Sequence, residues 1–153
     1  MTHRVFVYGT LKQGYPNNPL LEGSEFLGEA VTVPTYKMVE TSFPVIMPDP
    51  SGKPVAGEIY TVDDATLARL DQLEREGRSY DRVMIDATLP LANGERLTTQ
   101  AFIYVGREDR FGEMFARGPL YEQANERGEL DWRGITVTVH LTAARFRAAF
   151  WRE

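Results

Sequence analysis

The chain has 153 residues, of which 42% are apolar and 25% charged, a balance typical of one soluble globular domain spanning 1–153. The absence of cysteine excludes disulfides, thiolate metal sites and cysteine nucleophiles, and fits a reducing compartment. A net charge of −5 argues against a nucleic-acid partner, because such proteins carry basic patches. The apolar run at 5–7 is too short for a signal-peptide core or a membrane span, so we expect a cytoplasmic protein without membrane contact.

Strands and loops alternate through the first 60 residues. Gly9 ends the first apolar run, and Pro34 interrupts a β-branched and aromatic stretch, so that stretch is one bent strand or two short ones. Four prolines within twelve residues predict a loop further along. The expected elements are a strand at 4–8, a helical turn before Gly23, strand character over 26–39, a loop over 43–54 and a strand at 55–60.

The second part of the chain begins with the clearest helix. Asp63 is a suitable N-cap, Leu67, Leu70 and Leu73 supply an apolar stripe, and Asn93-Gly94 is a strong hairpin signal. The expected elements are a helix from Asp63 to Gly77, strands at 83–91 and 97–105, helix-like pieces at 111–116 and 120–127, a strand at 135–141 and a C-terminal helix from Thr142. Such a run of strands with few helices indicates an α+β domain with an antiparallel-rich sheet.

Only two histidines are present, which excludes a three-histidine zinc site, and we expect no metal. His3 lies at a terminus expected to fray. His140 shares the polar face of the strand at 135–141 with threonines, so a structural role is favoured over a catalytic one.

Glu74 is unusual because it lies on the apolar side of its helix. At 3.6 residues per turn it projects close to Leu67 and Leu70, where a carboxylate is costly unless it is paired or protonated. Two structural explanations are open: an ion pair with an arginine in 75–82, or a helix end that opens to solvent. The functional alternative is a carboxyl whose pKa rises toward neutrality and suits proton transfer. Periodicity alone does not decide between them.

The loop after the first strand, Tyr8 to Gly14, is the second unusual feature. It leaves a buried strand through glycine and can present backbone N–H groups to an anion. It is not a nucleotide loop, because Tyr15 and Pro16 stand where Lys and Ser/Thr would be required. By itself it is an ordinary strand-ending turn. Tyr80, just after the helix, is by itself a core-capping tyrosine with its hydroxyl in water.

Two separated blocks of sequence nevertheless agree with one family. The first block is Val5-Phe-Val-Tyr-Gly-Thr-Leu-Lys-Gln-Gly-Tyr-Pro-Asn17. The second comprises Gly57-Glu-Ile-Tyr60, Leu70-Asp-Gln-Leu-Glu74 and Tyr80-Asp-Arg82. Together they resemble the γ-glutamyl cyclotransferase-like family, and within it the γ-glutamylamine cyclotransferase branch. The resemblance covers about 4–105, while 106–153 is unmatched and is expected to form a lid and a C-terminal helix.

The resemblance implies a small, mixed, mainly antiparallel β-barrel flanked by helices. It also implies a cofactor-independent enzyme that releases 5-oxoproline and a free amine from a small γ-glutamyl substrate, acting as a monomer or homodimer. Glu74 matches the catalytic position, and Tyr80 matches a position beside the active site. Asn17 also matches a family position. The family's substrate-binding positions are matched by four loop residues: Tyr8, Gly9, Thr10 and Leu11.

Two other functions are weighed against this one. A non-catalytic small-molecule-binding or stress-associated protein could use the same fold, but such relatives lack the helix-end glutamate that Glu74 represents here. A docking helix carrying Phe146, Phe150 and Trp151 is the third candidate, and core or dimer packing explains that stripe better.

Overall fold

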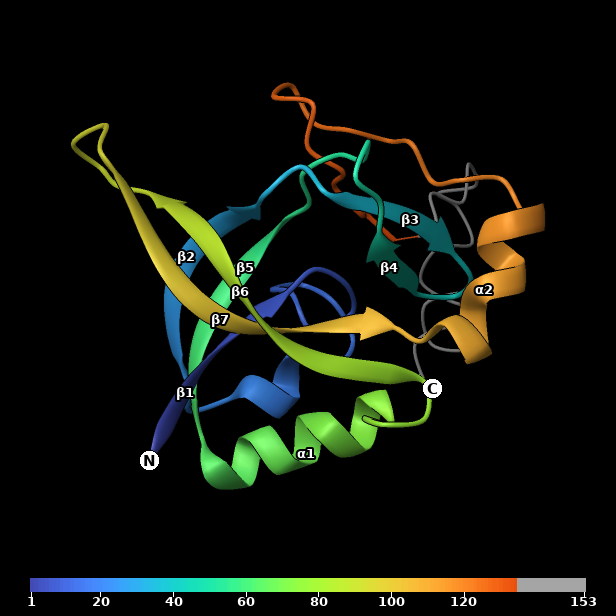
Figure 1. The fold of residues 1–153 in the computed structure, drawn as a ribbon. Helices are drawn as coiled ribbons and strands as arrows, with labels where there is room; N and C mark the ends of the chain where they lie inside the picture. The colour runs from blue at the N-terminus through green and yellow to red at the C-terminus, as the bar shows by residue number, and fades with distance from the viewer. Residues whose placement is uncertain (135–153) are drawn as a thin grey trace, which may run out of the picture.

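The computed structural model describes residues 1–134 of the chain. Within these residues strands dominate, with two α-helices and one short 3-10 helix (Figure 1). In chain order the elements are β1 (Thr2–Val7), η1 (Asn18–Leu21), β2 (Glu25–Thr32), β3 (Tyr36–Glu40), β4 (Pro44–Pro48), β5 (Ala56–Asp63), α1 (Asp64–Glu74), β6 (Tyr80–Pro90), β7 (Arg96–Gly106) and α2 (Glu108–Arg117).

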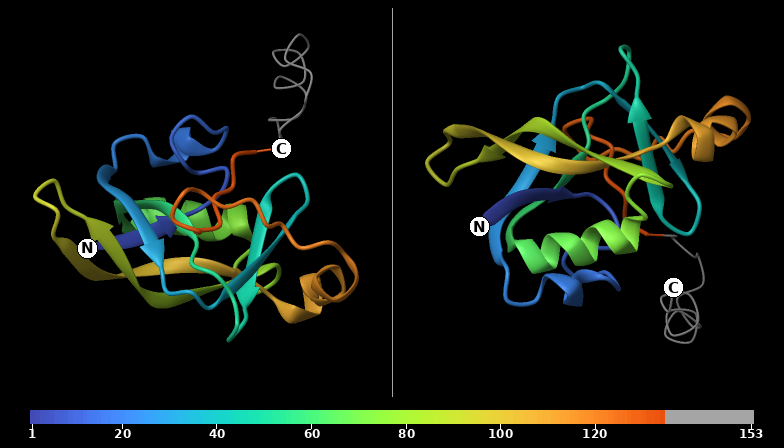
Figure 2. Two further views of the ribbon diagram at one scale, coloured as in Figure 1. Left: turned by 90° about the horizontal axis from the view of Figure 1, so that it is seen from above. Right: turned by 60° about the horizontal axis from the view of Figure 1, so that its bottom comes forward.

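Five strands form a closed barrel in the order β1-β5-β2-β6-β7. All neighbouring pairs are antiparallel except β1 and β7, which close the barrel in parallel through Val5 and Phe102. Figure 2 shows the strands curling around the core, with α1 along the outside of β1. The expected mixed, mainly antiparallel barrel flanked by helices is therefore confirmed.

A separate two-stranded sheet pairs β3 with β4, and it corrects the loop expected over 43–54. The prolines of this segment do not prevent a strand, because Pro44 and Pro48 stand at its two ends. Between them, Val45 and Ile46 are completely buried, and this burial stabilises the strand. The break expected at Pro34 is confirmed, since Pro34 lies between β2 and β3.

Helix α1 begins as the sequence predicts and ends earlier. The Asp63 side chain accepts a hydrogen bond of 2.7 Å from the Thr66 N–H, which is an N-cap interaction. Leu70 is fully buried against the barrel, whereas Leu73, predicted for the same apolar stripe, is 36% exposed. The helix stops at Glu74, because Arg75 adopts a left-handed conformation (φ 50°) and takes the C-cap position that the sequence assigned to Gly77.

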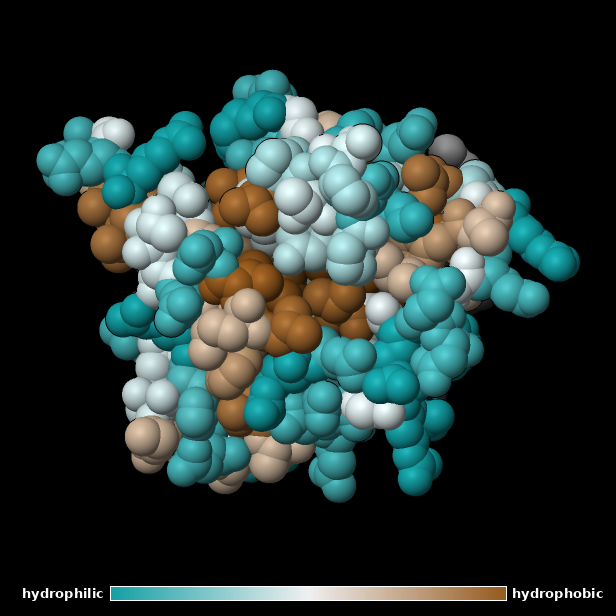
Figure 3. Space-filling model, viewed as in Figure 1, coloured by the Kyte–Doolittle hydropathy of each residue, from teal (hydrophilic) through white to brown (hydrophobic). Residues whose placement is uncertain are grey.

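The long hairpin β6–β7 agrees with the sequence, although β6 begins at Tyr80 instead of residue 83. Its turn uses Asn93-Gly94, with Gly94 at φ 87°, a conformation that glycine adopts without strain. Apolar residues gather near the centre of the molecular face in Figure 3, with polar side chains around them. Among the exposed apolar side chains are Met84 of β6 and Leu97 of β7.

The segment after β7 departs most from the expectation. The helix-like piece at 111–116 lies within α2, but 120–127 is not helical. This part of the chain is irregular instead, with an isolated bridge between Ala124 and Leu130, because the burial of Leu130 and Trp132 against the barrel holds it there. Two expected elements lie outside the described residues: the strand at 135–141 with His140, and the C-terminal helix. The expected lid and C-terminal region over 106–153 lies partly outside them. Within 1–134, no helix is long and apolar enough to cross a membrane.

Candidate active site

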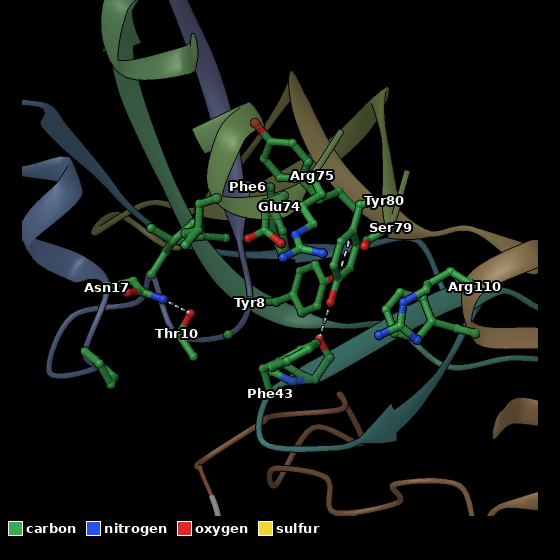
Figure 4. A pocket seen from close by; sticks show the side chains of 18 residues that line it. Phe6, Tyr8, Thr10, Asn17, Phe43, Glu74, Arg75, Ser79, Tyr80 and Arg110 are labelled. Atoms are coloured by element: carbon green, nitrogen blue, oxygen red, sulfur yellow. Dashed lines mark hydrogen bonds between the residues drawn. The ribbon is translucent and has the colours of Figure 1, made fainter. Parts of the chain in front are cut away.

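A pocket of about 410 Å³ opens where the first loop, the end of α1 and the start of α2 meet. Its walls come from segments far apart in the chain, and Figure 4 shows their side chains converging. All the site residues expected from the sequence line it: Tyr8, Gly9, Thr10, Leu11, Asn17, Glu74 and Tyr80. The fold thus brings the whole predicted constellation to one cavity.

The loop after β1 is held in a fixed shape by its own hydrogen bonds. The Asn17 side-chain amide donates to Thr10 Oγ1 at 2.8 Å, and the Asn17 N–H donates to the Thr10 carbonyl at 2.9 Å (Figure 4). The Lys12 N–H donates to the Gly9 carbonyl at 3.1 Å. Within residues 1–134, the N–H groups of Thr10 and Leu11 have no backbone partner, so they are available as donors to a ligand.

Residues outside the loop also hold it in place through hydrogen bonds. Asn18 donates to the Leu11 carbonyl at 2.9 Å, and Glu58 on β5 accepts from the Gln13 N–H at 2.9 Å. The Lys12 ammonium is buried and donates to the Trp132 carbonyl at 2.5 Å. The loop is therefore ordered before any ligand arrives, which reduces the entropy lost on binding.

Gly9 is required by close packing. A Cβ atom at this position would lie 2.8 Å from Cγ of Pro44, closer than such atoms approach in folded proteins. We expect Gly9→Ala to lower the free energy of unfolding by about 1–2 kcal/mol, because Pro44 is buried at the start of β4 and the added methyl group would overpack this contact. Urea unfolding measures this loss. The double variant Gly9→Ala/Pro44→Ala, which removes the ring, should recover most of it, and equal losses in both variants would contradict the packing explanation.

Glu74, the last residue of α1, faces the pocket and is only partly exposed. Burial raises the pKa of its carboxyl from 4.5 to about 7. Neither structural explanation offered by the sequence holds. Within the described residues no arginine pairs with Glu74, since Arg82 instead binds Asp71 at 2.5 Å, and the helix end opens into a pocket and not to bulk solvent.

Two tyrosines stand beside Glu74 (Figure 4). The Tyr8 hydroxyl donates to the Tyr104 carbonyl at 2.6 Å, and the Tyr80 hydroxyl donates to the Pro44 carbonyl at 3.3 Å. The pKa of each phenol is raised, first by burial and then by nearby charge, including that of Glu74. Tyr80 is 5% exposed, so its hydroxyl is not in water as the core-capping alternative expected. Both phenols stay neutral, and they supply a rigid wall.

The pocket also contains residues that the sequence did not assign to a site. Arg75, considered only as an ion-pair partner of Glu74, follows it, and Arg110 comes from α2; the others include Phe43, Ser79 and Phe111. Proximity to Glu74 was a signal for Arg75 and Ser79, but nothing in the sequence places α2 at this pocket. His3 lies in β1 and not at a frayed end, with its Nε2 2.6 Å from Asp64 Oδ1, and it does not line the pocket. In the part of the chain that the structure describes, no group of three or more acidic, histidine or cysteine side chains could hold a metal ion.

Comparison with known families agrees with this geometry. Residues 5–130 match the family described as gamma-glutamyl cyclotransferase, AIG2-like. The chain belongs to this family. The family match, together with the relatives named below, makes it an enzyme of the cyclotransferase class and confirms the resemblance that the two sequence blocks indicated.

Named relatives and a solved structure support the same assignment. Gamma-glutamylaminecyclotransferase B of Danio rerio is 36% identical over 134 residues, covering 82% of this chain and 69% of that protein. Gamma-glutamylaminecyclotransferase of Bos taurus is 38% identical over 109 residues, covering 65% and 63%. The crystal structure of an AIG2-like protein from Mus musculus superposes with a TM-score of 0.66 at 26% identity, covering 89% and 99%. Family and fold are therefore established together.

Proposed function

We propose that this cyclotransferase releases 5-oxoproline and a free amine from a γ-glutamyl amine or γ-glutamyl amino acid. The α-amine of the γ-glutamyl group attacks its own γ-carbonyl, a five-membered lactam forms, and the bond to the attached amine breaks. The observation that carries this proposal is the Glu74 carboxyl, poised near pKa 7 in a pocket beside a pre-ordered loop.

Glu74 moves the protons in this reaction. The α-nitrogen starts as an ammonium and ends as a lactam N–H, so it loses two protons, and the departing nitrogen gains two. No water is consumed. A carboxyl with a pKa of about 7 is populated in both forms at neutral pH, so it can take each of the two protons from the α-nitrogen and pass it to the leaving nitrogen, which departs as an ammonium.

The loop orients the substrate for cyclisation. The free N–H groups of Thr10 and Leu11 suit the α-carboxylate of the γ-glutamyl group, a pairing that charge strengthens. Because the reacting atoms belong to one molecule, holding it in the cyclising conformer supplies several kcal/mol of the rate enhancement. The same intramolecularity is why we propose a reaction that needs no cofactor.

Mass-spectrometric detection of 5-oxoproline tests the proposed function. Purified protein is incubated with γ-glutamyl amines, γ-glutamyl dipeptides and glutathione, beside enzyme-free samples that measure spontaneous cyclisation. We expect 5-oxoproline and the free amine in equal amounts from at least one class, well above the enzyme-free rate. Glutamate in place of 5-oxoproline would mean hydrolysis, and no product from any class would contradict the proposal.

A further inference from the structure

Two arginines line the pocket of a protein whose net charge is −5. Four other arginines of the described residues are neutralised by nearby carboxylates: Arg82 by Asp71, Arg107 by Asp81, Arg127 by Glu129 and Arg133 by Asp131. Within residues 1–134, neither Arg75 nor Arg110 forms such an ion pair. Their positive charge is left available to whatever occupies the pocket.

Arg110 lies at the end of the pocket away from the loop. Figure 4 shows Thr10 and Asn17 on one side of Glu74, with Tyr80, Ser79 and Arg110 on the other. The guanidinium of Arg110 stacks over the Phe111 ring, 4.8 Å from its centroid. This stacking limits the freedom of the side chain, and less entropy is then lost when a ligand binds.

The two ends of the pocket suit the two ends of a γ-glutamyl substrate. If the loop binds the γ-glutamyl group and Glu74 exchanges protons with the two reacting nitrogens, the leaving amine extends away from the loop. It then meets Arg110, with Arg75 contributing positive charge close by. A guanidinium binds a carboxylate through two parallel hydrogen bonds. A leaving amine that carries only an alkyl chain cannot form this arrangement.

We propose that Arg110 binds a carboxylate of the leaving group, so that the preferred substrates are γ-glutamyl amino acids and short γ-glutamyl peptides, not plain γ-glutamyl alkylamines. The inference rests on the proposed function and adds to it the chemical class of the amine. It assigns a specificity role to a residue of α2, in a region where the family motifs seen in the sequence have ended.

A matched substrate pair tests the inference. γ-Glutamyl-alanine and γ-glutamyl-alaninamide differ only in the terminal carboxylate. We expect wild-type kcat/KM to favour the acid by about tenfold, and Arg110→Gln to remove most of that preference by slowing the acid alone. The preference should also weaken as salt is added, because the Arg110 side chain is exposed to solvent. Arg117→Gln removes a positive charge from the same helix outside the pocket and should leave the preference unchanged.

The outcomes separate this inference from the proposed function. Equal rates for the two substrates, or an equal loss for both in Arg110→Gln, would overturn the role of Arg110 while 5-oxoproline formation still stood. Calorimetry with Glu74→Gln protein measures binding of the same two compounds without turnover. Tighter binding of the acid that depends on Arg110 supports the inference even if no 5-oxoproline forms. Binding of neither compound overturns it.

Discussion

Glu74→Gln is expected to lower kcat by about a thousandfold or more while leaving the fold intact. Glutamine has nearly the shape of a protonated glutamate, so the partly buried site at the end of α1 accommodates it. An amide cannot accept and return a proton at neutral pH. General acid–base groups contribute about 10²–10⁴ to rates, and both proton transfers proposed here pass through this one carboxyl.

The measurement is 5-oxoproline release under saturating substrate, together with substrate binding. Affinity should change little in Glu74→Gln, because the proposed substrate contacts come from the loop and from Arg110, so the loss should appear in kcat. Glu113→Gln, an exposed position on α2, makes the same chemical change away from the pocket and should keep full activity. Normal turnover in Glu74→Gln would remove the acid–base assignment.

The inward position of Glu74 could be predicted because a helix is periodic. Leu67 and Leu70 fix the buried side of α1, and the next residue on that side is Glu74. What periodicity could not provide was the surroundings of the carboxyl. The pocket depends on where β1, the β3–β4 sheet and α2 come together, and long-range packing determines that meeting.

The two wrong elements have one physical origin. Prolines argued against a strand at 43–54, and helix-forming residues argued for a helix at 120–127, but both arguments are local. Burial of Val45 and Ile46 outweighs the first tendency, and burial of Leu130 and Trp132 outweighs the second. These segments nevertheless shape the site: Pro44 packs against Gly9, and the Trp132 carbonyl anchors Lys12.

Arg110 could not have been identified from the sequence for a similar reason. It belongs to a stretch rich in Glu, Arg, Asp and Gly, where one arginine looks like any other on a solvated helix. Only the packing of α2 beside the start of β6 brings Arg110 to the pocket, next to Tyr80. The sequence therefore identified the part of the pocket formed by the loop and Glu74, where the reaction is proposed to occur. The fold was needed to identify the part around Arg110, which is assigned here to the leaving group.

The raised pKa of Glu74 also has a consequence for stability. A carboxyl that holds its proton more tightly in the folded state than in the unfolded state stabilises the fold at low pH. For Glu74 this contribution is complete below about pH 4.5 and is lost as pH rises through about 7. One pKa unit corresponds to about 1.4 kcal/mol, which limits the whole effect to about 3 kcal/mol. The ionised carboxyl thus opposes folding in the pH range where the reaction needs it.

Glu74→Gln should therefore be more stable than wild type at pH 8, by an amount that shrinks toward pH 5. The glutamine amide does not titrate, so the variant does not lose stability as pH rises, whereas wild type does because its carboxyl ionises. Between these two pH values we expect the difference in free energy of unfolding to change by about 2 kcal/mol, measured by urea denaturation. Glu113→Gln serves as the reference for removing a surface carboxylate. A difference that stays constant with pH would mean that burial does not raise the Glu74 pKa, and the proton-transfer role would lose its physical basis. A gain in stability accompanied by lost turnover would instead show that the fold tolerates an unfavourable charge where catalysis requires it.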